Sequence, residues 1–192
     1  MPAHFARPAL PTGSGPRFIY NVVHWHLLLN HLPVIAVPLG LGFYLWGWFR
    51  PTQEFQKAGL ALWIFAGLAA IPVYLTGESA AGYMRRLGVA PALIHAHANA
   101  AGYALTGVLI LAAAALLAWY GIHARRLGRL PRGPAVVLLL LALGVSGIMY
   151  WTAETGGYIR HTEIRPGFRF PARINSPVKS RVANQNAGRK HQ

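Results

Sequence analysis

Histidine side chains recur in two short clusters of this chain, together with amide side chains that could orient them. The members of the two clusters are, in chain order, His24, His26, Asn30, His31, His95, His97 and Asn99. Imidazole nitrogens bind iron, copper and zinc, and they also bind haem iron. A repeated His-x-His motif therefore predicts a site for a haem or for a metal ion.

A second duplicated pattern follows each histidine cluster. Both copies read Tyr-x-Thr-x-Glu, which pairs Thr76 with Thr152 and Glu78 with Glu154. Because the two patterns occur in the same order in each half, the sequence predicts a duplicated helical hairpin. We expect the threonines and glutamates to lie beside the histidines, where they orient a ligand or relay protons.

The composition is that of a membrane protein. Of the 192 residues, 54% are hydrophobic and 11% are charged, whereas soluble domains carry about 25% charged residues. Four windows of at least 20 residues, each enough to cross a bilayer core of about 30 Å, contain no Asp, Glu, Lys or Arg: 18–49, 58–77, 87–124 and 133–153. The sequence therefore predicts an all-α integral membrane four-helix bundle.

The boundaries of the parts follow from charge and proline. The expected helices cover 19–49, 58–76, 91–121 and 134–153. The chain thus divides into an N-terminal tail (1–18), a transmembrane domain (19–159) and a basic extramembrane C-terminal tail (160–192). The absence of cysteine excludes disulfides, thiolate metal sites and covalently attached c-type haem.

Helix direction brings the polar groups to one membrane face. The first and third helices run the same way, so both histidine clusters begin at the same face, and the second and fourth helices end there. Two residues in a His-x-His motif differ by about 200° around a helix. Only one histidine of each pair can therefore face the interior, and the spacing leaves open which one.

Opposed imidazoles in a four-helix bundle are typical of a b-type haem site. We expect one haem b, or two if all histidines take part, with Arg85 available to a propionate. Asn30 follows His26 by four residues and Asn99 follows His95 by four, a spacing that lets an amide orient a ring. A non-haem metal bound by histidines and glutamates is the alternative, although the di-iron signature Glu-x-x-His is absent.

The formal charge of +14 lies in loops and tails. Basic residues scattered on both sides of a membrane favour lipids and neighbouring subunits as partners and exclude nucleic acid. The densest cluster in a short loop marks the cytoplasmic side and consists of Arg125, Arg126, Arg129 and Arg132. The tails and the histidine-rich face are therefore expected on the periplasmic side.

Two segments resemble a known family. Asn30-His31-Leu32-Pro33-Val34, preceded by His26, is similar to the histidine–proline motif of a bacterial four-helix membrane family, domain of unknown function 2231. Leu75-Thr76-Gly77-Glu78-Ser79-Ala80, followed by Ile94-His95-Ala96-His97, resembles its second signature. The likeness covers roughly residues 22 to 155, and it departs at Ala98, where the family commonly has an acidic residue.

The resemblance implies a haem-dependent redox function in the bacterial inner membrane, because members of this family occur beside or fused to Rieske and cytochrome-type domains. It points to His26, His31, Glu78 and His97. The repeat and the resemblance agree best on His26 and His97, which we expect as the axial ligands. The expected function is a b-type haem electron-transfer subunit of a larger redox complex, rather than a catalyst on its own. His24, His31 and His95 are alternate ligands or ligands of a second haem.

Two other functions stay open. The first is a cofactor-free accessory subunit that stabilises a complex through its tails. The second is a non-haem metal or proton-transfer protein, with His26, His97 and His31 as metal ligands and with Glu78 and Glu154 in proton transfer.

Overall fold

The computed structural model describes residues 22–50, 53–124 and 130–168, which are almost entirely helical. The elements are α1 (Val22–Leu29), α2 (His31–Phe49), α3 (Gln53–Arg86), α4 (Pro91–Ala124), α5 (Arg132–Arg160) and the short 3-10 helix η1 (Thr162–Ile164). Helices α1 and α2 together form one candidate membrane span, and α3, α4 and α5 form three more. All four are long and apolar enough to cross a membrane, so the predicted all-α four-helix membrane bundle is confirmed.

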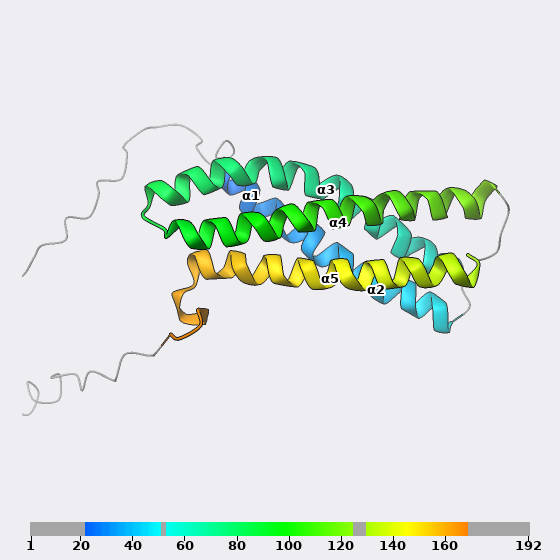
Figure 1. The fold of residues 1–192 in the computed structure, drawn as a ribbon. Coiled ribbons are helices and arrows are strands. Elements are labelled where there is room, and N and C mark those ends of the chain that lie inside the picture. Colours follow the sequence, from blue (N-terminus) through cyan, green and yellow to red (C-terminus); the bar gives the residue numbers. More distant parts are fainter. Residues whose placement is uncertain (1–21, 51–52, 125–129, 169–192) are drawn as a thin grey trace, which may run out of the picture.

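The helices run lengthwise along one another (Figure 1), and their contacts close a ring. Helix α3 packs against α2 and α4, and α5 packs against α4 and also against α2. The start of α1, the turn between α3 and α4, and the end of α5 all lie toward one end of the bundle, here called the histidine end. There α1 takes the place of α2 and packs mainly against α3.

An apolar core fills the bundle except near the histidine end. Its largest fully buried side chains include Trp63, Tyr44 and Leu60. Helices α2 and α3 touch through their backbones, because a Cβ on Gly59 would lie 2.7 Å from the carbonyl oxygen of Gly40. Toward the histidine end, the last members of this core are Ala36, Ala70, Ala104 and Met149.

Helix α3 continues ten residues beyond the end predicted from the sequence. It ends at a left-handed glycine, Gly88, whose φ is +79°. The N–H of Gly88 donates to Arg85 O (3.0 Å) and the N–H of Val89 donates to Met84 O (3.2 Å), which is a Schellman motif. Thr76 therefore lies inside the helix, about 15 Å before its end.

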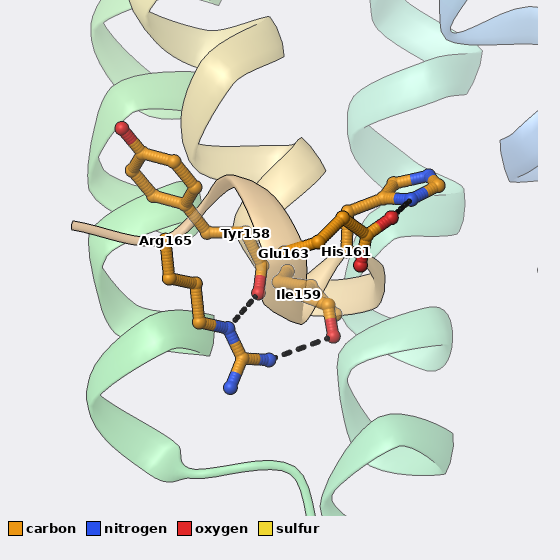
Figure 2. A network of polar contacts seen from close by, with 5 residues as sticks. All are labelled: Tyr158, Ile159, His161, Glu163 and Arg165. Atoms are coloured by element: carbon orange, nitrogen blue, oxygen red, sulfur yellow. Dashed lines mark hydrogen bonds and ion pairs between the residues drawn. The ribbon is translucent and has the colours of Figure 1, made fainter. Parts of the chain in front are cut away.

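Helix α5 also runs longer than predicted, and a capping structure closes it (Figure 2). The guanidinium of Arg165 donates to the carbonyls of Tyr158 (2.7 Å) and Ile159 (3.4 Å), which lack helical partners at this end. His161 Nδ1 lies 2.9 Å from the carboxylate of Glu163. Hydrogen bonds from its own backbone N–H and from His161 hold the pKa of Glu163 below its ordinary value.

Several expectations fall on residues outside the described ranges. They concern the N-terminal tail, most of the basic C-terminal tail, and the arginines at 125, 126 and 129. The predicted sidedness of the membrane therefore stays a prediction.

We predict that Gly88→Ala lowers the free energy of unfolding by about 1–2 kcal/mol, because an alanine strains the left-handed backbone. A Cβ at this position would meet no atom within 4 Å, so conformation is the whole effect. Gly82→Ala is the matched control, since Gly82 is helical and has equally open space around it; it should be neutral or stabilising. Circular dichroism of SDS-titrated protein measures the difference, and equal effects would contradict the prediction.

Candidate functional site

His26 lies against α3 and bonds to its backbone. Its Nδ1 is 3.0 Å from the carbonyl oxygen of Val73 and 3.3 Å from Thr76 Oγ1. The Thr76 hydroxyl donates to Pro72 O (2.8 Å) or Val73 O (2.9 Å), so toward the ring it can only accept. Because a carbonyl also only accepts, Nδ1 carries the proton, and the lone pair of the neutral ring is on Nε2.

His97 makes the same contacts with α5. Its Nδ1 is 3.1 Å from the carbonyl oxygen of Thr152 and 3.4 Å from Thr155 Oγ1. The Thr155 hydroxyl donates to Trp151 O or Thr152 O, each at 3.0 Å. His97 is therefore also an Nδ1–H imidazole with a lone pair on Nε2.

A glycine makes room for each ring. A Cβ on Gly77 would lie 3.3 Å from Cε1 of His26, and a Cβ on Gly156 would lie 3.0 Å from Cε1 of His97. Each ring thus sits where a helix of the following membrane span offers a carbonyl at position i, a threonine at i+3 and a glycine at i+4. We call these sites the α3 notch (73, 76, 77) and the α5 notch (152, 155, 156).

The two notches correct the register of the repeat. The counterpart of Thr76 is Thr155, not Thr152 as the Tyr-x-Thr-x-Glu pattern indicated. Thr152 contributes its carbonyl instead, and its hydroxyl donates to Ile148 O at 2.8 Å. Sequence reasoning missed Val73, Gly77, Thr155 and Gly156. The signal that could have found them is the Thr-Gly dipeptide, which occurs late in the second helix of each half.

The second histidine of each His-x-His motif is the one that contacts a neighbouring helix; these are His26 and His97. The first members, His24 and His95, are exposed, whereas the notch-bound members are half-buried. His31 is also exposed, and its Nδ1 lies 3.2 Å from Leu27 O in its own helical segment. This is the division that the 200° helical spacing requires.

The other residues expected at the site differ in their exposure and in their hydrogen bonds. Asn30 is half-buried, and its Oδ1 is buried without a hydrogen-bond partner. Glu154 accepts a hydrogen bond from the Tyr158 hydroxyl at 2.6 Å. The backbone carbonyls of Val73 and Thr152 orient the histidines, a role expected of the glutamates and amides. The remaining three are exposed: Asn99, Glu78 and Arg85.

The two notches lie toward the same end of the bundle. His26 and His97 lie near the starts of α1 and α4, and their acceptors Val73 and Thr152 lie in the later parts of α3 and α5. Within the described parts of the chain, no three His, Asp or Glu side chains gather closely enough to hold a metal ion, and His26, His97 and His31 form no such group.

The fold and the site define a helical bundle with four candidate membrane spans and two equivalently held imidazoles. The chain matches no protein-family model, no curated protein and no solved structure at a significant level. The resemblance drawn from the sequence motifs stays a prediction.

We predict that Gly156→Ala displaces the His97 ring, because the new Cβ would lie 3.0 Å from Cε1 and 3.2 Å from Nδ1. The free energy of unfolding should fall by about 1–3 kcal/mol, as for other overpacked sites. The ¹⁵N resonances of labelled histidines report the Nδ1–H tautomer and its loss. Gly102→Ala is the control on the same end of the bundle, with nothing within 4 Å of the added Cβ. Unchanged His97 signals in Gly156→Ala would show that the notch does not hold the ring.

Proposed function

We propose that this protein is a membrane-bound b-type haem electron-transfer subunit of a larger redox complex, with His26 and His97 as axial ligands. The observation that carries the proposal is the pair of Nδ1–H···O=C hydrogen bonds. They fix the tautomer and orientation of both rings and leave Nε2 of each for a ligand bond.

The donor set fits a haem. When bound, a haem b supplies a one-electron carrier, and its iron needs only two axial ligands from the protein because the porphyrin supplies four. The hydrogen bond at Nδ1 makes Nε2 a stronger ligand. The Thr76 and Thr155 hydroxyls support the same proton from a second side.

The surroundings of the notches are consistent with an inserted group. The contiguous apolar core ends at the level of Ala36 and Met149, and the buried apolar side chains beyond it are Ala80, Met84, Ile94 and Ala100. The buried and unpartnered Oδ1 of Asn30 lies one turn from His26. Arginines at the ends of α3 and α5 are the cationic candidates for the propionates: Arg85, Arg86 and Arg160.

A non-haem metal centre has less support. Such a centre takes at least three protein ligands, and the described residues hold no such group. Glu154 is engaged by Tyr158, and Glu78 is exposed. In a cofactor-free accessory subunit the two imidazoles would only join helices through Nδ1, and the Nε2 of each ring would have no role.

The arrangement favours one haem, because two notches supply two ligands. The proposed partners are redox proteins of the same complex together with membrane lipids, and no nucleic acid. We propose the bacterial inner membrane as the location, with the histidine end on the periplasmic side.

We predict that His97→Ala and His26→Ala each abolish the haem b α-band of the wild-type protein or convert it to a high-spin spectrum. The matched controls are His95→Ala and His24→Ala, which remove an exposed imidazole two residues away on the same helices. A reduced-minus-oxidised spectrum and a pyridine haemochrome assay of the purified protein make the comparison.

A low-spin band retained in His97→Ala would refute the ligand assignment. A flat spectrum of the wild-type protein, purified with its native partners, would refute the haem proposal and favour an accessory subunit.

A further inference from the structure

His31 is an exposed histidine well inside a candidate membrane span. It lies nine residues after Val22, where the first span begins, whereas the other exposed histidines of the described ranges lie within four residues of a span end or outside the spans. His31 is also about 7 Å farther into the bundle than His26, because five residues of the span separate them. Polar side chains inside a membrane normally face the bundle interior or pair with another group, so an outward-facing histidine requires a reason.

One nitrogen of the His31 ring has a hydrogen-bond partner and the other has none. Nδ1 lies 3.2 Å from the carbonyl oxygen of Leu27 in the same span. A carbonyl only accepts, so Nδ1 carries the proton of the neutral ring, and Nε2 is an acceptor. Within the described parts of the chain, the bond to Leu27 O is the only side-chain hydrogen bond of His31. An acceptor without a donor is unfavourable in hydrocarbon.

A second acceptor lies about one turn farther along the same helix. Pro38 in α2 is exposed, and it has no N–H to donate to the carbonyl oxygen of Val34. Around the helix, Pro38 and His31 differ by about 700°, so they lie within about 20° of one another. Carbonyls that proline frees in transmembrane helices are satisfied by neighbouring helices, hydroxyl side chains or waters.

The outward side of α2 is shaped for another helix. We call it the α2 face and define it by five exposed residues: His31, Ile35, Pro38, Gly42 and Phe49. Their spacing follows the seam along which a second helix packs. A Cβ on Gly42 would meet no atom within 4 Å, and a glycine lets the backbones of two transmembrane helices approach closely. The spacing is common to any helix face, and the acceptors of His31 and Val34 are what the α2 face adds.

The chemistry of the α2 face selects its occupant, which must bring a hydrogen-bond donor. Acyl chains have none. A second copy of this chain bound through the same face would bring two further acceptors, because the Nδ1–H of its His31 is already used and the other side chains of the face have no N–H or O–H. A diffusing hydroquinone has donors but leaves the acceptors unpaired whenever it departs. A helix of a different subunit keeps a donor in place.

We propose that the α2 face is the interface for a transmembrane helix of another subunit. That helix donates an N–H or O–H from a polar side chain to Nε2 of His31, and it packs along α2 past Gly42. This inference rests on the proposed function only in that the protein is a subunit of a larger complex, and it does not depend on the haem.

Photo-crosslinking in the native membrane tests the interface. p-Benzoylphenylalanine in place of Ile35 should form a cross-link to a membrane-spanning peptide of another protein, identified by mass spectrometry. The same group in place of Leu143 on α5 is the matched control, because the two side chains are 57% and 59% exposed, and it should not cross-link to that peptide. Cross-links from Ile35 to lipid alone, or to a second copy of this chain, would overturn the proposal.

The role of His31 is tested by removing its acceptor. His31→Leu presents an apolar side chain to the partner, so the yield of the Ile35 cross-link should fall severalfold while the purified variant keeps its helix content. His95→Leu, which replaces an exposed histidine near the start of α4, should leave the yield unchanged. An unchanged yield in His31→Leu would refute the proposed hydrogen bond.

A hydroquinone as the occupant gives a different result. Tetramethylhydroquinone added to the purified protein in nanodiscs should leave the ¹⁵N signal of His31 Nε2 unshifted. A shift on addition, without a cross-link to a protein, would overturn the partner helix in favour of a diffusible donor. The haem proposal is judged separately: a His31-dependent cross-link from a protein without haem refutes the haem and leaves the interface standing, and a low-spin haem with cross-links to lipid alone does the reverse.

Discussion

The hydrogen bond from an imidazole to a helix carbonyl is the interaction on which the histidine end depends. A carbonyl oxygen has two lone pairs, and the helix uses one of them for the N–H four residues later. The second pair of Val73 and of Thr152 accepts the Nδ1–H of a histidine from the neighbouring helix. Each ring is thus satisfied by backbone that is already in place, without a charged partner in an apolar region where a charge is costly.

This bond constrains the sequence of the accepting helix. The residue at i+4 lies over the carbonyl, so a side chain there would occupy the space of the ring, and both copies have glycine. The threonine at i+3 donates to a carbonyl of its own helix and turns its oxygen toward the ring. Thr-Gly therefore makes a helix an acceptor for histidine without ending the helix, and α3 continues past it to Arg86.

Sequence patterns predicted what depends on composition and periodicity. The uncharged windows located the four spans, and the helical angle limited each His-x-His motif to one inward member. The carbonyl acceptors of the two histidines could not be predicted in this way. Every residue carries a carbonyl, and only the packing of the helices selects Val73 and Thr152. The pairing of Thr76 with Thr152 followed the longer Tyr-x-Thr-x-Glu match, although the functional match is the Thr-Gly dipeptide. The end of α3 also depended on the turn at Gly88 rather than on Gly77.

Both halves hold a histidine through the same hydrogen bond, but the helices that carry the two histidines differ. The second half has Ala101 and Ala104 where the first half has Asn30 and Pro33, so Leu29 O in the first span lacks the helical N–H partner that its counterpart in α4 has. The hydrogen bond between each histidine and its notch depends only on the residues close to it. It therefore forms in both halves despite the different residues that follow. A proline seven residues after His26 removes one backbone hydrogen bond of its helix without changing the bond that orients the ring. The same hydrogen bond to a helix carbonyl therefore forms in both halves although the helices that carry the two histidines differ.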